Sequence, residues 1–251
     1  MKIQLLICAA ALAVGTLFTT STAAGADKPK PIKVLLVTGD DVSPAHNWRE
    51  VSQAVRETLT ATGKFEVRVS EDPAILDSAA GLSRYDLVFL QFYNAKSPTL
   101  SDGAKENLAQ FIKGGKGMVV SHLSSASFKE WDEFRMMCGR YWVMGKSGHG
   151  PRSTFKVKIA DKANPITKGM EDFEADDELY AKLEGDAPIK VLVEADSDWS
   201  KKTEPLVFVL EYGKGRVFHQ AFGHDGKAVN NPSVQKLIQR GSEWAATGAV
   251  Q

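Results

Sequence analysis

Three short apolar segments constrain the fold of this chain more than any other feature. They are residues 32–37 (IKVLLV), 86–90 (DLVFL) and 117–122 (GMVVSH), and most of their side chains are hydrophobic. A strand that is apolar along its whole length is buried on both faces, which is typical of a parallel sheet covered by helices. The sequence therefore predicts an open α/β sheet with helices on both faces.

Segments with helical periodicity separate or follow these strands. Apolar side chains recur at helical spacing in residues 48–62, 104–112 and 234–245. Ser101 is expected to cap the start of the second helix, and Asn231 that of the third, where Pro232 takes the first helical position. No internal repeat or long linker interrupts the pattern, so one domain is expected.

The second half of the chain is richer in strands. Four strands are predicted at residues 154–159, 189–194, 205–210 and 216–221. Residues 212–215 (YGKG) form a tight turn, so the last two strands are expected to make an antiparallel hairpin. The acidic residues Asp172, Glu174, Asp176 and Asp177 are interpreted as a solvated loop.

The N-terminus has the pattern of a secretory signal. Lys2 gives a basic start, residues 3–18 are apolar, and Ala24-Gly25-Ala26 provides a small-residue cleavage site. The apolar run of 16 residues is shorter than the roughly 20 that cross a bilayer, which disfavours an anchor. A signal peptide of residues 1–26 and a domain of residues 27–251 are predicted, with a periplasmic or secreted location and no membrane association after cleavage.

The net charge limits the kinds of ligand that the chain can attract, and the cysteine content limits the cross-links that it can form. The 31 basic and 31 acidic residues become 30 and 31 once Lys2 is removed with residues 1–26, a net charge of −1. Such a chain has no bulk field to hold nucleic acid or an anionic membrane, and an uncharged ligand fits better. With Cys8 in the signal segment, only Cys138 remains, so no intramolecular disulfide is expected. Cys138 is interpreted as a core residue, and a nucleophilic role is the weaker alternative.

The histidines are the main candidates for chemistry. His46 follows the first strand, His122 ends the fourth predicted strand, and His224 follows the last. Ligands gather at the carboxyl ends of parallel strands. His149 lies in the glycine-containing loop 145–150, and Glu178 adds a carboxylate. Imidazole and carboxylate groups transfer protons and bind divalent ions such as Zn²⁺. For each histidine alone, a solvated side chain is the competing interpretation.

Other residues receive secondary roles. Tyr93 and Asn94 follow the third strand and would reach the same edge of the sheet. Trp131, Phe134 and Met137 are spaced as a helical stripe that faces the core, and sugar stacking by Trp131 is the second interpretation. His219 lies inside a strand and is interpreted as structural. The chain has no G-x-G-x-x-G after the first strand, which argues against a dinucleotide site.

Several motifs together resemble the trehalose-utilisation (ThuA-like) family over residues 33–244. They are residues 122–128 (HLSSASF) with Trp131, 147–151 (SGHGP), 164–169 (NPITKG), 177–180 (DELY), 212–218 (YGKGRVF) and 223–225 (GHD). The resemblance implies a fold of the class I glutamine-amidotransferase-like superfamily, with a flavodoxin-like, mostly parallel sheet and the C-terminal hairpin. It also puts His122 where amidotransferases carry their cysteine nucleophile, so glutaminase activity is not expected.

The resemblance implies a role in carbohydrate metabolism, with a small-molecule carbohydrate as the partner. The expected function is an exported enzyme of lyase, hydrolase or isomerase type that acts on a glycoside or keto-sugar. A non-catalytic carbohydrate-binding or scaffold protein is the alternative. The expected cofactor is a divalent metal, Zn or Mn. The expected catalytic residues are His122, His149 and Glu178; the expected metal ligands are His122, His149 and His224; the expected substrate-binding residues are His46, Tyr93, Asn94 and Trp131.

Overall fold

The computed structural model describes residues 30–39, 45–94 and 100–251. The predicted signal segment, residues 1–26, lies outside these ranges. None of the helices within them combines the length and the apolar character needed to cross a bilayer. The strands are β1 (Ile32–Gly39), β2 (Phe65–Ser70), β3 (Leu87–Phe92), β4 (Gly117–Ser121), β5 (Ser153–Ile159), β6 (Phe173–Asp177), β7 (Lys190–Ser197), β8 (Lys202–Tyr212) and β9 (Gly215–Gln220).

The helices lie mainly between the strands of the first half and at the end of the chain. They are α1 (Trp48–Thr60), α2 (Ala79–Leu82), α3 (Asp102–Lys113), α4 (Asp132–Cys138), α5 (Gly226–Val229) and α6 (Pro232–Thr247), with 3-10 helices η1 (Pro73–Asp77) and η2 (His122–Ala126). The predicted caps are confirmed, because the side chains of Ser101 and Asn231 accept backbone N–H groups in the first turns of α3 and α6.

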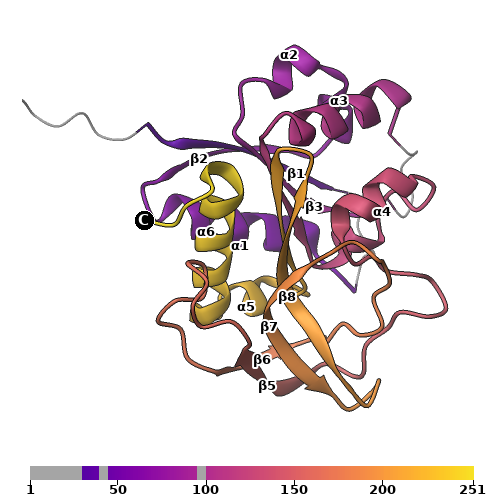
Figure 1. Cartoon of the computed structure of the whole chain (residues 1–251), viewed down its shortest axis with the longest axis vertical. Coiled ribbons are helices and arrows are strands. Elements are labelled where there is room, and N and C mark those ends of the chain that lie inside the picture. Colours follow the sequence, from indigo (N-terminus) through magenta and orange to yellow (C-terminus); the bar gives the residue numbers. More distant parts are fainter. Residues whose placement is uncertain (1–29, 40–44, 95–99) are drawn as a thin grey trace, which may run out of the picture.

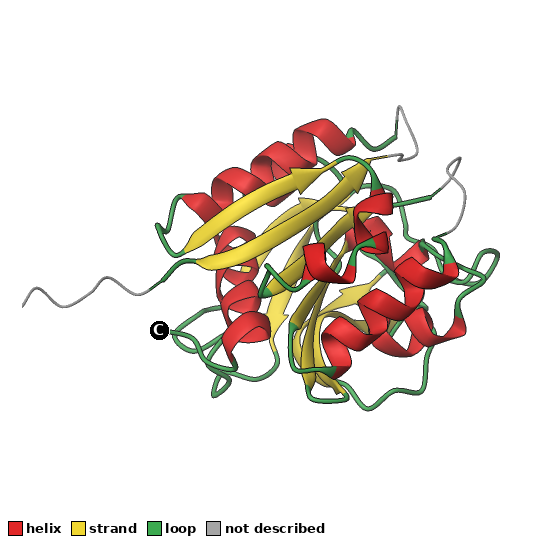
Figure 2. Cartoon of the chain, turned by 90° about the horizontal axis from the view of Figure 1, so that it is seen from above, coloured by secondary structure: helices red, strands yellow, loops and turns green. Residues whose placement is uncertain are grey.

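Five strands form the parallel half of a single nine-stranded sheet (Figure 1), in the order β2-β1-β3-β4-β9. Successive side chains of β1 point to opposite faces: Val34 and Leu36 pack with α1 and α6, and Leu35 and Val37 pack with α3 and α4. Figure 2 shows helices on both sides of these strands. The apolar runs predicted a sheet that is buried on both faces, and this packing confirms the prediction.

The other half of the sheet is antiparallel. The order continues from β9 through β8, β7 and β5 to β6, and each of these pairings is antiparallel. The predicted hairpin is confirmed, with Tyr212 opposite Gly215 and with Gly213 at a φ of +62° in its turn. The expected mostly parallel sheet is wrong, because the hairpin continues into three more strands. The sheet is mixed, with four parallel and four antiparallel pairings.

Strand β6 replaces part of the predicted acidic loop. Ala175 and Asp177 are buried on one face of this strand, and Glu174 on the other face is exposed. Asp172, just before the strand, accepts a hydrogen bond from the backbone N–H of Ile159 at 2.9 Å. The interpretation as a solvated loop is therefore wrong, since alternation along the strand outweighs its acidic composition.

Trp131 and Cys138 belong to the core on the α3/α4 side of the sheet. Trp131 is 8% exposed and stacks on Phe134, with ring centroids 5.8 Å apart. Cys138 is fully buried, and burial raises the pKa of its thiol well above the ordinary value. The core interpretation of both residues is confirmed. The sugar-stacking role of Trp131 is corrected, because its indole is packed between protein side chains.

His219, on β9, is expected to make the protein sensitive to acid. Its ring is fully buried against Phe208, its Nδ1–H donates to the Cys138 carbonyl at 3.0 Å, and burial lowers its pKa from 6.5 to about 4. The unfolded chain therefore takes up a proton at a higher pH than the folded protein does. The free energy of unfolding should fall as the pH drops from about 6.5 to about 4, by about 3 kcal/mol in full.

Denaturant unfolding at several pH values measures this effect. The variant His219→Gln, which has no titrating group at this position, should lose less stability over the same pH range than the wild type. Equal losses in the two proteins would contradict the assignment of acid sensitivity to His219.

Candidate active site

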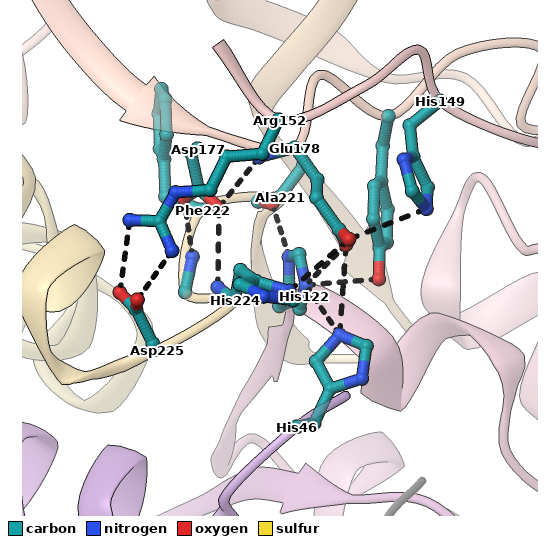
Figure 3. Close-up of polar contacts among 12 residues, drawn as sticks. His46, His122, His149, Arg152, Asp177, Glu178, Ala221, Phe222, His224 and Asp225 are labelled. Atoms are coloured by element: carbon teal, nitrogen blue, oxygen red, sulfur yellow. Dashed lines mark hydrogen bonds and ion pairs between the residues drawn. The ribbon is translucent and has the colours of Figure 1, made fainter. Parts of the chain in front are cut away.

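Three loops at the carboxyl ends of parallel strands bring three histidines together (Figure 3). His46 lies between β1 and α1, His122 is the first residue after β4, and His224 lies between β9 and α5. The strands β1, β3, β4 and β9 are neighbours in the sheet, so their carboxyl ends share one edge. Glu178 comes from the antiparallel half, directly after β6, and points into the same space.

The four side chains form a compact cluster. The Nε2 atoms of His46 and His122 are 3.2 Å apart, and each lies 3.6 Å from Oε2 of Glu178. Nδ1 of His224 lies 3.2 Å from Oε1 of the same carboxylate. One nitrogen or oxygen atom from each residue lies within 4.8 Å of those of the other three.

His122 is held in a defined orientation by its backbone and its second ring nitrogen. Its φ of +47° is in the left-handed region, which a residue with a Cβ adopts at a cost. Its Nδ1 lies 2.7 Å from the carbonyl oxygen of Ala221, and because a carbonyl only accepts, Nδ1 carries the proton. In the neutral ring, Nε2 therefore carries a lone pair that faces the cluster and can accept a hydrogen bond or bind an ion.

His149 and Tyr180 complete the surroundings. Nδ1 of His149 donates to the Gly150 carbonyl at 2.7 Å, and its Nε2 lies 3.5 Å from Oε1 of Glu178. The Tyr180 ring stacks on His122 on one side and on His149 on the other, and its hydroxyl lies 3.0 Å from Nε2 of His122. The His149 side chain is 32% exposed, whereas that of Glu178 is 10% exposed, so His149 forms the solvent side of the cluster.

The charges of the cluster depend on one another. Burial raises the pKa of Glu178, but its contacts with His122 and His46, together with the charge of His122 and His149, outweigh burial and hold that pKa well below its usual range. Burial lowers the pKa of His122, but Glu178 and the nearby Asp177 raise it above the ordinary value overall. Glu178 is therefore ionised at neutral pH, and it stabilises positive charge among the imidazoles.

Asp177 and Arg152 fix the loop that carries His224. The buried carboxylate of Asp177 accepts the backbone N–H groups of Gly223 at 2.7 Å and of His224 at 3.2 Å. Arg152 forms ion pairs with Asp176 at 3.1 Å and with Asp225. These contacts connect the end of β6 to the segment after β9, which places Glu178 opposite His224.

The cluster fits a divalent metal ion. Zn²⁺ with ligands at about 2.0–2.1 Å in a tetrahedron requires ligand atoms about 3.4 Å from one another. Four of the separations in the cluster, between 3.2 and 3.6 Å, are close to this spacing, and the complete set of ligand atoms lies within 4.8 Å of one another. Oε2 of Glu178 is buried and has no hydrogen-bond donor among the described residues. The Nδ1–H of His122 on a backbone carbonyl is the usual second contact of a histidine that binds a metal.

The structure brings together most of the predicted site residues, but two of the histidines lie elsewhere than their predicted roles implied. His46, predicted to bind substrate, lies in the four-residue cluster, and His149, predicted as a metal ligand, lies outside that group. Asn94 accepts the backbone N–H of Phe128 at 2.9 Å, and Tyr93 beside it is half-buried. Asp177 and Tyr180 were not predicted as site residues. Their place in the motif of residues 177–180 (DELY), which also contains Glu178, was the signal in the sequence that pointed to them.

Comparison with known proteins places the chain in a family. The family model described as trehalose utilisation matches residues 33–245. The chain belongs to the ThuA family. A crystal structure described only as a ThuA-like protein, from Parabacteroides merdae ATCC 43184, is 29% identical, with a TM-score of 0.76 over 88% of this chain and 92% of that one. A second, from Bacteroides uniformis ATCC 8492, is 15% identical, with a TM-score of 0.69 over 90% and 98% of the two chains.

The ThuA fold also occurs as part of larger enzymes. The β-galactosidase of Rahnella sp. R3 is similar over 86% of this chain but only 31% of its own, with 19% identity and a TM-score of 0.57. At that identity the similarity concerns the fold alone. No curated protein matches the chain.

Proposed function

We propose that this ThuA family protein is an exported enzyme that acts on a glycoside or keto-sugar by acid–base chemistry with the help of a divalent ion. The observation that carries the proposal is the cluster of His46, His122, His224 and Glu178 at one edge of the sheet. The family description, trehalose utilisation, supports a carbohydrate as the partner. The near-neutral charge of the chain agrees with an uncharged ligand and offers no bulk field for nucleic acid.

The proposed residue roles follow from exposure and charge. His46, His122, His224 and Glu178 would hold the ion, either Zn²⁺ or Mn²⁺. Bound there, the ion would supply a Lewis acid that polarises a ketone oxygen of the sugar. Because the pKa of Glu178 is well below its usual range, this carboxylate is a weak base. His149 is the more exposed group, and its Nε2 faces the cluster.

In the proposed reaction, His149 removes a proton from carbon. A keto group in a sugar ring acidifies the C–H bond on the adjacent carbon. His149 takes that proton on Nε2, and Glu178, 3.5 Å away, stabilises the resulting imidazolium. In an elimination, His149 then gives the proton to the leaving oxygen. In an isomerisation, it gives the proton to the former ketone carbon, while the hydroxyl proton on the adjacent carbon passes to the former ketone oxygen. Neither outcome requires a covalent bond between enzyme and sugar, in keeping with the burial of Cys138.

Two further assignments belong to this proposal. The signal pattern of residues 1–26 supports a periplasmic or secreted location. The parallel strands β2-β1-β3-β4-β9 follow the 2-1-3-4-5 order of flavodoxin-like sheets, so we propose that name for this half of the fold. A non-catalytic carbohydrate-binding protein is the alternative function, and it predicts sugar binding that does not depend on the histidines.

Metal analysis combined with a substrate screen tests the proposed function. The purified protein should bind about one Zn²⁺ or Mn²⁺ per chain and convert oxidised (3-keto) glycosides but not the unoxidised sugars. The variant His122→Asn keeps a residue that tolerates the left-handed backbone. It should lose turnover by about 10²-fold or more and bind the ion more weakly. A protein without bound ion whose His122→Asn variant binds sugars normally would favour the alternative.

A further inference from the structure

The loop that carries the proposed base, His149, is paired with the segment that carries Glu178. Gly148 and Ala181 exchange two backbone hydrogen bonds, of 3.1 and 2.8 Å, in an antiparallel bridge. The segment of Ala181 also includes Tyr180, whose ring stacks on that of His149 with the centroids 5.9 Å apart. One face of the loop is therefore held against the candidate active site.

The opposite face of the loop packs on Trp199, in the turn between β7 and β8. A Cβ added at Gly148 would lie 2.7 Å from Cη2 of the indole, and one added at Gly150 would lie 3.5 Å from Cβ of Trp199. Side chains at residues 148 and 150 would thus point to Trp199. The residue between them, His149, points the other way, as successive residues of a strand do, and faces Glu178 (Figure 3).

Trp199 also contacts the segment that pairs with the loop. The Lys182 ammonium lies 4.4 Å from the centroid of the indole, a cation–π contact. The carbonyl oxygen of Lys182 accepts the hydroxyl of Ser147 at 2.7 Å. The Trp199 side chain is 42% exposed, so the indole covers the outside of this pair of segments and connects the two.

The contact with Trp199 explains why residue 148 is a glycine. Gly148 is not among the residues with a positive φ, so its backbone conformation would also suit alanine. Carbon atoms in contact lie about 3.5–4.0 Å apart. A Cβ at 2.7 Å from the indole is too close, and either the ring or the loop would have to move.

We propose that Trp199 is a positioning residue, which holds the loop of residues 147–150 so that His149 stays in reach of Glu178 and of the C–H bond of the sugar. It acts on His149 through the backbone of Gly148. The inference rests on the proposed function, in which His149 removes the proton, and it adds a residue from the β7–β8 turn to that function. A displacement of about 1 Å can lower turnover by about 10²-fold.

A double-mutant cycle tests this inference. The kcat for a 3-keto glycoside is measured in Gly148→Ala, Trp199→Ala and the double variant. Each single variant should lower kcat by about tenfold or more, because each breaks the contact. Trp199→Ala removes the ring that the new Cβ would meet, so the double variant should lose about as much as one single variant, not the product of both losses.

Ion binding and a control variant separate positioning from a general disturbance of the site. The affinity of Trp199→Ala for Zn²⁺ should equal that of the wild type, because none of the proposed ligands lies in the loop or in the β7–β8 turn. Met144→Ala removes an exposed apolar side chain from the turn that precedes the loop, and it should keep the wild-type kcat.

Amide hydrogen exchange provides a measurement that needs no substrate. The N–H groups of Gly148 and Ala181 make the two hydrogen bonds of the bridge. Both should exchange about tenfold faster in Trp199→Ala than in the wild type, because the loop opens more often. Thermal unfolding of each variant establishes that it is folded.

The outcomes distinguish this inference from the proposed function. Unchanged exchange in Trp199→Ala, wild-type kcat in either single variant, or losses that multiply in the double variant would overturn the role of Trp199 and leave the proposed reaction intact. A wild type that converts no sugar would contradict the reaction. Faster exchange at Gly148 and Ala181 in Trp199→Ala would then still support the hold of the indole on the loop.

Discussion

Replacing Glu178 by glutamine should remove divalent ion binding and turnover together. The carboxylate lies 3.2–3.6 Å from ring nitrogens of four histidines. Glutamine has nearly the same shape but no charge, and its NH₂ group would point donors at nitrogens that also have to donate or bind an ion. We expect ion affinity to fall by at least about 10²-fold and turnover by about 10³-fold.

The measurement is metal titration and turnover of a 3-keto glycoside by Glu178→Gln. Glu174→Gln is the matched control, because Glu174 belongs to the same acidic segment but is exposed on β6. The control should behave as the wild type does. Retention of both ion and turnover by Glu178→Gln would show that the cluster is not the site of the chemistry.

Replacing Asp177 by alanine should lower the free energy of unfolding strongly. The carboxylate of Asp177 is 1% exposed and accepts three backbone N–H groups: those of Gly223, His224 and Glu178. Alanine leaves all three donors without an acceptor in a site that water reaches poorly. At about 1–3 kcal/mol for each unsatisfied buried group, and with some relaxation, the free energy of unfolding should fall by about 3–5 kcal/mol.

Asp176→Ala is the control for this prediction. Asp176 is the preceding residue, but its side chain is 34% exposed and its partners are Arg152 and Lys227 at the surface. Its loss should cost less than about 1 kcal/mol. Denaturant unfolding of both variants gives the comparison, and equal losses would contradict the role of Asp177 in connecting β6 to the His224 loop.

The sequence predicted the parallel half of the fold well because local patterns determine it. The apolar runs at β1, β3 and β4 and the caps at Ser101 and Asn231 are short-range signals. The antiparallel half depends on long-range pairing. Strand β6 pairs with β5 through only five residues, and its acidic side chains conceal the alternation of Ala175 and Asp177. No local pattern shows that the C-terminal hairpin continues to a sheet edge.

The site was predictable in part for the same reason. His46, His122 and His224 follow strands, so the rule for parallel sheets brings them to one edge. Glu178 reaches that edge only because Asp177 binds the backbone beyond β9. The contact of Tyr180 with His122 depends on this placement too. Trp131 is the opposite case, because its helical spacing correctly indicated the core.

The position of β9 between β4 and β8 has a consequence for the order of assembly. This strand joins the two halves of the sheet, yet it begins only at Gly215, after all the other strands. A growing polypeptide therefore cannot complete the cluster until its last member, His224, has been synthesised. An ion that binds only the completed cluster would favour the native state by about 4 kcal/mol when its free concentration is a thousandfold above its dissociation constant. Occupancy of the cluster would then report that the whole domain has folded.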